Sequence, residues 1–131
     1  MLDTNVLLSM LLFPSQKMET LIRIILSDYQ LVLSSFIIDE LLEVTHRKFE
    51  GKEEAVKLFL DQLPYEHICL PEHLETDLFT IRDENDYPVL YAAVVEKVDF
   101  FITGDKDFKD LGLETPKIVS PTEFIEIRSS E

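Results

Sequence analysis

The sequence predicts an α/β domain of three layers, in which helices flank both faces of a small, mainly parallel sheet. Short apolar runs of strand length alternate with longer segments whose apolar residues recur at helical spacing. Alternation of this kind is typical of a parallel sheet covered by helices. The 131 residues are 46% hydrophobic and contain no repeat or linker. We therefore expect one domain over residues 1–131.

The first half of the chain is expected to hold short strands and four helices. Met1 and Leu2 end a very short strand, and Thr4 or Asn5 can cap the helix that follows. Ser15 can cap the next helix, because apolar residues recur at helical spacing after it. The other elements expected here are a strand over 30–33 and helices over 36–49 and 52–63.

The second half continues the alternation. The helix expected over 87–97 has Pro88 in its first turn, where proline is tolerated. A buried strand is expected over 99–103, because its apolar residues are continuous. The other elements expected here are a strand over 66–70, a short helix over 71–81, a turn or short helix through 110–112, a strand over 117–119 and a last helix from residue 121.

The net charge of −14 argues against a basic platform for nucleic acid, because phosphate binding normally rests on Lys and Arg. Two interpretations are open. The carboxylates can form a solvated acidic surface, or some of them can form a site for a cation.

The lone cysteine, Cys69, excludes an internal disulfide and is typical of a reducing compartment. Its position between Ile68 and Leu70 predicts a small buried side chain. No apolar run is long enough to span a bilayer, and we see no signal peptide. These features predict a cytoplasmic protein.

Acidic residues follow two of the predicted strands. Asp3 comes after the first, and Asp105 and Asp107 come after the strand over 99–103. Ligand sites in parallel sheets lie at the carboxyl ends of the strands, so these residues form a candidate cluster. The alternative is that each aspartate only caps a helix.

Two further carboxylates are candidates from their helical positions. Glu40 and Asp39 lie at the margins of an apolar helix face, whereas Glu43 points to solvent. At such a margin a carboxylate can reach an adjoining cleft. The alternative is that it is an ordinary residue flanking the apolar face. Asp86 begins a helix, where it can be a cap, and Asp83 competes with it for either role.

Other chemistry has little support in the sequence. Arg82 can bind phosphate or pair with a neighbouring acid, and the remaining cations form no stripe. There is no Gly-rich phosphate loop, no nucleophile elbow and no Cys–His pairing. Clustered carboxylates favour Mg²⁺ or Mn²⁺, and such ions lower the pKa of a water that attacks phosphate.

Four segments occur in the order seen in PIN domains, and the chain resembles that family over essentially its whole length. The segments are 2–7 (LDTNVL), 39–44 (DELLEV), 82–86 (RDEND) and 102–107 (ITGDKD), and residues 117–124 resemble the family's closing strand and helix. The resemblance is greatest to the bacterial and archaeal toxins of toxin–antitoxin pairs.

The resemblance implies an Mg²⁺- or Mn²⁺-dependent ribonuclease that leaves a 5′-phosphate and a 3′-hydroxyl. Asp3, Glu40, Asp86 and Asp105 match the family's catalytic, metal-binding acids, and Asp107 matches an auxiliary acid at the metal site. Asn5 and Thr103 match residues that support the cluster by hydrogen bonding. The implied partners are RNA, a second copy in a homodimer, and an antitoxin that reaches into the acidic groove.

Two other functions remain open. A PIN-like scaffold that binds a partner protein without chemistry is compatible with the acidic charge. Another Mg²⁺ enzyme, such as a Toprim-like nuclease or a phosphatase, is compatible with Glu40 and the pair Asp105 and Asp107. This last alternative leaves the match around residues 3–5 unexplained.

Overall fold

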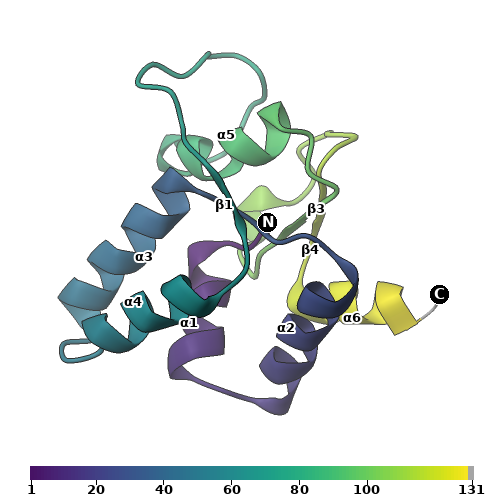
Figure 1. The fold of residues 1–131 in the computed structure, drawn as a ribbon. Helices are drawn as coiled ribbons and strands as arrows, with labels where there is room; N and C mark the ends of the chain where they lie inside the picture. Colours follow the sequence, from purple (N-terminus) through teal and green to yellow (C-terminus); the bar gives the residue numbers. More distant parts are fainter. Residues whose placement is uncertain (130–131) are drawn as a thin grey trace.

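The computed structural model describes residues 1–129, which form helices around short strands (Figure 1). No helix in this range is long and apolar enough to cross a bilayer. The α-helices are α1 (Thr4–Leu12), α2 (Gln16–Asp28), α3 (Ser35–Lys48), α4 (Glu53–Gln62), α5 (Tyr87–Val95) and α6 (Pro121–Ser129). The strands are β1 (Val32–Ser34), β2 (Glu66–Ile68), β3 (Phe100–Ile102) and β4 (Lys117–Val119), and two 3₁₀ turns are η1 (Glu84–Asp86) and η2 (Lys106–Phe108).

The strands pair in parallel, as the sequence predicts. β1 pairs with β2, and β3 pairs with β4. The short N-terminal segment adds a parallel bridge between Leu2 and Ile102. In this bridge the Ile102 amide donates to the Met1 carbonyl at 2.9 Å, and the Asp3 amide donates to the Ile102 carbonyl at 3.0 Å. The bridge therefore places Asp3 next to the carboxyl end of β3.

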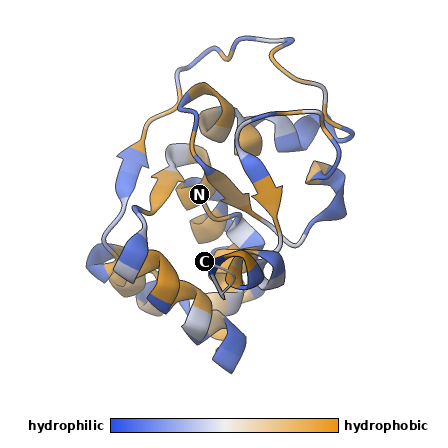
Figure 2. Cartoon of the chain, turned by 90° about the vertical axis from the view of Figure 1, so that its right-hand side faces the viewer, coloured by the Kyte–Doolittle hydropathy of each residue, from blue (hydrophilic) through white to orange (hydrophobic). Residues whose placement is uncertain are grey.

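Helices cover the strands from several sides and bury the apolar residues between them. α2 and α6 lie side by side, and α3 and α4 form a second pair on the far side of α1 (Figure 1). The strands in the middle of the molecule carry mostly hydrophobic residues (Figure 2). Leu2, Leu33 and Phe101 are fully buried there. The mixed α/β architecture is thus confirmed.

The predicted helix over 71–81 is wrong, because this segment forms no regular helix. Two tyrosine hydroxyls from α5 satisfy part of its backbone instead. Tyr87 Oη donates to the Glu75 carbonyl at 2.6 Å, and Tyr91 Oη accepts from the Glu75 amide at 3.2 Å. The Phe79 ring also stacks on Tyr87, with the ring centroids 4.4 Å apart. Contacts with α5 therefore replace the helical ladder, which the sequence pattern does not reveal.

The expectation that Cys69 is buried is also wrong, because its side chain is exposed. Side chains alternate between the two sides of an extended chain. Ile68 and Leu70 are half-buried and pack against the core, so Cys69 between them points outward.

Candidate active site

Asp3 is a buried carboxylate at the junction of the N-terminal bridge and α1. Only 6% of the residue is exposed. Its Oδ1 accepts from the Thr4 amide at 2.7 Å, so Asp3 caps α1 in place of the expected Thr4 or Asn5. Its Oδ2 accepts from the Thr103 hydroxyl at 2.8 Å. Each oxygen of an ionised carboxylate has a second lone pair, so this cap can still bind a cation.

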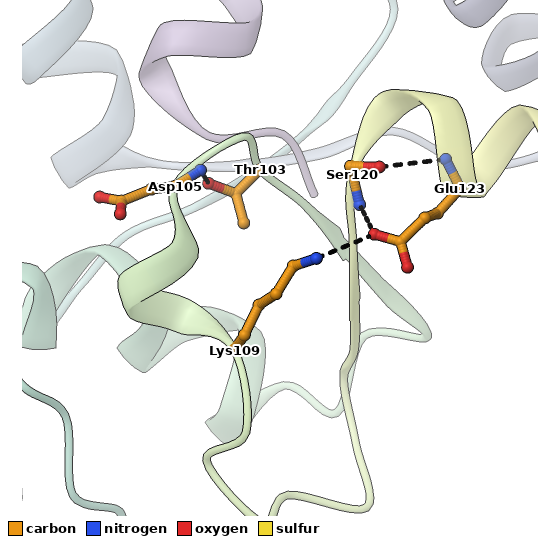
Figure 3. A network of polar contacts seen from close by, with 5 residues as sticks. All are labelled: Thr103, Asp105, Lys109, Ser120 and Glu123. Carbon is orange, nitrogen blue, oxygen red and sulfur yellow. Dashed lines mark hydrogen bonds and ion pairs between the residues drawn. The ribbon is translucent and has the colours of Figure 1, made fainter.

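Thr103 connects Asp3 to the segment that follows β3. Its hydroxyl donates to Asp3 and accepts from the Asp105 amide at 3.0 Å (Figure 3). One buried hydroxyl thus fixes two candidate ligands relative to each other. Asn5 differs, since it is exposed and its side chain makes no hydrogen bond within residues 1–129. Its supporting role stays a prediction.

Asp105 directly precedes η2 and Asp107 lies on it, and hydrophobic packing attaches this turn to the core. Asp105 caps the turn by accepting from the Asp107 amide at 2.9 Å. Phe108 is 1% exposed and packs on the ring of Phe101, with the centroids 5.2 Å apart. The two aspartates therefore extend from a turn that one buried aromatic residue holds in place.

A polar network joins the end of η2 to α6 (Figure 3). Ser120 Oγ accepts from the Glu123 amide at 3.1 Å, and Glu123 Oε1 accepts from the Ser120 amide at 3.0 Å. This reciprocal pair is a capping box at the start of α6. Lys109 Nζ lies 3.4 Å from the same Glu123 oxygen. These hydrogen bonds lower the pKa of Glu123, and Lys109 lowers it further.

Glu40 lies on α3 and faces the start of α1. Ser34 caps α3 by accepting from the Ile37 amide at 3.2 Å. It is also the last residue of β1, which covers 32–34 in place of the expected 30–33. Ile37 and Leu41 are fully buried, so Glu40 between them is half-buried at the margin of the apolar face. The Thr4 hydroxyl donates to Glu40 Oε1.

Thr4 is therefore a site residue that the sequence reasoning considered only as a cap. The available signal was its place directly after Asp3, in the first turn of a helix. Glu43 is exposed, as expected from its helical position, and its Oε1 pairs with Arg47 Nε at 2.9 Å.

Asp86 and Asp83 have different roles in the structure. Asp83 is exposed and caps η1 by accepting from the Asn85 amide at 2.9 Å. Asp86 is half-buried at the start of α5, whose residues Val89 and Leu90 are in the core. One carboxylate oxygen from each of Asp86, Asp105 and Asp107 lies within 4.8 Å of the others.

These carboxylates repel one another and are partly withdrawn from water. Burial raises the pKa of Asp3 most, and the charges of Glu40 and Asp105 raise it further against its hydrogen bonds. Burial and the charges of Asp83, Asp105, Asp3 and Asp107 raise the pKa of Asp86 to about 6. A cation would relieve this repulsion.

The donor set fits a hard divalent cation. The Asp86, Asp105 and Asp107 cluster offers only carboxylate oxygens, which Mg²⁺ and Mn²⁺ prefer. Asp3 and Glu40 are outside this group of three, but Asp3 is electrostatically coupled to Glu40, Asp105 and Asp86. The structure thus groups three of the five acids named from the sequence, and the charge of Asp3 links this group to Glu40.

The raised pKa of Asp86 predicts that metal-free protein loses stability as pH rises. Its pKa is about 6 in the folded protein, against an ordinary value of 3.8 for an aspartate in an unfolded chain. A carboxyl group whose pKa is higher in the folded protein stabilises the fold at low pH. Its contribution to the free energy of unfolding is lost as pH rises from about 4 through 6. In EDTA, we expect the melting temperature to fall more between pH 5 and 7.5 for wild type than for Asp86→Asn.

The matched control is Asp61→Asn, at an exposed position on α4. It should keep the wild-type pH dependence. Equal pH dependence of wild type and Asp86→Asn would show that repulsion at Asp86 does not act on stability.

Comparison with known proteins identifies the family of the chain. The family described as PIN domain matches residues 1–107, a range that contains all the candidate acids. Neither the curated proteins nor the solved structures include a significant match. Since the family match covers most of the sequence, the chain belongs to the PIN-domain family.

Proposed function

We propose that this protein is an Mg²⁺- or Mn²⁺-dependent endoribonuclease. PIN domains are generally nucleases, and they use a divalent metal ion. The observation that supports the proposal best is the grouping of Asp86, Asp105 and Asp107 within 4.8 Å, with the charge of Asp3 acting on Asp86 and Asp105. Family membership supports nuclease chemistry, and RNA as the substrate is our more specific proposal.

The five acids would act in this mechanism by holding a cation. Asp86, Asp105 and Asp107 would hold a cation, and Asp3 and Glu40 would complete its surroundings. When bound, the cation would neutralise charge on the phosphodiester and lower the pKa of the attacking water. Thr103 orients Asp3, and Thr4 orients Glu40, through hydrogen bonds from their hydroxyls. Such supporting hydrogen bonds keep ligands in the geometry that a cation needs.

A catalytically inactive scaffold is the second candidate function, and the net charge of −14 favours it. An acidic surface weakens RNA binding, because phosphates are repelled. Titration with Mn²⁺ separates the two functions. The nuclease should gain a saturable rise in melting temperature and cleave RNA with Mn²⁺ but not with EDTA. A blank result in both assays would favour the scaffold.

Glu40→Gln is expected to reduce RNA cleavage by roughly 10–100-fold, an effect typical of removing a group that supports a metal site. The glutamine carbonyl can still accept from Thr4, so the fold should persist. The measurement is the initial cleavage rate in Mn²⁺, with the melting temperature as a check on folding.

Glu43→Gln provides the matched control one turn away on the same helix. Glu43 is exposed and pairs only with Arg47 within the described residues, so cleavage should stay within about twofold of wild type. Similar losses in both variants would contradict a specific role for Glu40.

The proposed setting is a cytoplasmic toxin of a toxin–antitoxin pair, acting as a homodimer. A basic segment of an antitoxin is the natural complement of the acidic cluster. A small basic protein encoded next to this one, which binds it and blocks cleavage, would support the setting. Asp105→Asn should weaken that binding, whereas unchanged affinity would place the antitoxin elsewhere.

A further inference from the structure

Arg82 extends to the rim of the acidic cluster from the loop before η1. Its Nη1 lies 3.9 Å from Asp107 Oδ1, and 67% of its side chain is exposed. Within residues 1–129 this ion pair is the only interaction of the guanidinium, which makes no hydrogen bond. The cation is therefore near the candidate metal ligands without being tightly bound to them.

Two other cations of the chain are held more closely by their carboxylate partners. Arg47 lies 2.9 Å from Glu43 on α3, and Lys109 lies 3.4 Å from Glu123 at the start of α6. The pair of Arg82 and Asp107 is longer and exposed on both sides. Pairs of this kind add little to stability. A structural role therefore leaves the position of Arg82 unexplained.

The backbone fixes where Arg82 emerges. The next residue, Asp83, caps η1, and η1 ends at Asp86. Arg82 is thus attached to the turn that carries one member of the cluster, and its side chain reaches another member, Asp107. A guanidinium in this place has free N–H donors in a planar fork, which matches the oxygens of a phosphate.

The substrate of a ribonuclease must approach this cluster despite the net charge of −14. We propose that Arg82 is a substrate-binding residue that contacts a phosphate of the RNA backbone beside the Asp86, Asp105 and Asp107 cluster. This inference rests on the proposed ribonuclease function. A cation held by Asp107 would compete with Arg82 for that carboxylate and leave the guanidinium available for the phosphate.

The test compares Arg82→Ala and Arg82→Lys in the full chain, with a single-stranded RNA as substrate and Mn²⁺ as the metal. Arg82→Ala should raise KM by roughly 10–100-fold, the effect expected for a lost hydrogen bond to a charged group. Its kcat should stay within about threefold, and Arg82→Lys should recover part of the loss. The slope of log KM against log salt concentration should fall by about 0.7, the value for one phosphate contact on a single strand.

Two measurements separate this role from a structural one. Mn²⁺ binding is measured through the rise in melting temperature. It should be unchanged or tighter in Arg82→Ala, because the guanidinium no longer competes with Mn²⁺ for Asp107. Arg47→Ala is the matched control and should keep wild-type KM and salt dependence. Wild-type KM in Arg82→Ala, or a loss of kcat alone, would overturn the inference while leaving the nuclease function intact. A wild-type protein that neither cleaves RNA nor responds to Mn²⁺ would overturn both.

Discussion

Asp105→Asn is expected to lower RNA cleavage at least about 100-fold while the protein remains folded, since charge stabilisation at a reacting centre contributes effects of this size. Asp105 is central to the site. It caps η2 by accepting a hydrogen bond from the Asp107 amide, and it belongs to the cluster with Asp86 and Asp107. An asparagine oxygen can keep the cap but cannot supply the negative charge. The measurement is the cleavage rate at saturating Mn²⁺, with melting temperature measured in EDTA.

Asp110→Asn is the matched control for this substitution. Asp110 is exposed and has a φ of 59°, a left-handed conformation that asparagine tolerates. Its cleavage rate should equal that of wild type. Asp107→Asn should fall between the two, because Asp107 matches only an auxiliary acid of the family and already pairs with Arg82. Wild-type cleavage by Asp105→Asn would remove this residue from the proposed mechanism.

Many strand and helix positions were predictable because capping residues and short apolar runs mark where these elements begin and end. Ser15 caps α2 as expected, and the apolar run at 99–103 contains β3. The position of Asp105 follows from the same logic, since the residue after a parallel strand lies at the edge where ligands bind. Local patterns of this kind depend on residues a few positions apart, so the sequence displays them directly.

Contacts between distant segments were not predictable in the same way. The segment over 71–81 is shaped by the hydroxyls of Tyr87 and Tyr91, which lie in a different element. Thr4 and Glu40 are 36 positions apart and meet through a side-chain hydrogen bond. Neither pairing has a periodic signal. The acids themselves were identified through the family's motif order, whereas the grouping of Asp86, Asp105 and Asp107 within 4.8 Å required the structure.

The alternative roles of cap and ligand are compatible in this site. Asp3 and Asp105 are both helix caps, and both remain candidate ligands. Capping engages one lone pair of a carboxylate that has four acceptor positions. It also fixes the side-chain rotamer before any cation arrives. A cap at the end of a strand is therefore a preorganised ligand, so the presence of a capping bond does not argue against function.

Asp3→Asn distinguishes these two roles at the most buried acid. The asparagine oxygen can accept the Thr4 amide and keep the cap, but its amide group would face the Thr103 hydroxyl. The lost bond from Thr103 costs stability, whereas removal of a buried charge whose pKa is raised restores some. We expect a melting temperature in EDTA near that of wild type, a smaller rise with Mn²⁺, and cleavage reduced at least about 100-fold.

Asp3→Ala completes the comparison, because alanine removes both the charge and the cap. It should be less stable than Asp3→Asn by about 0.5–2 kcal/mol, the usual cost of a lost N-cap, with cleavage equally low. If Asp3→Asn cleaved RNA like wild type and only Asp3→Ala failed, Asp3 would be a helix cap alone. The cluster at the end of β3 would then have to work with Asp86, Asp105 and Asp107 as its only closely grouped acids. If Asp3→Asn and Asp3→Ala lose RNA cleavage equally but differ in stability, the negative charge of Asp3 serves the chemistry. Its capping hydrogen bond then serves the fold.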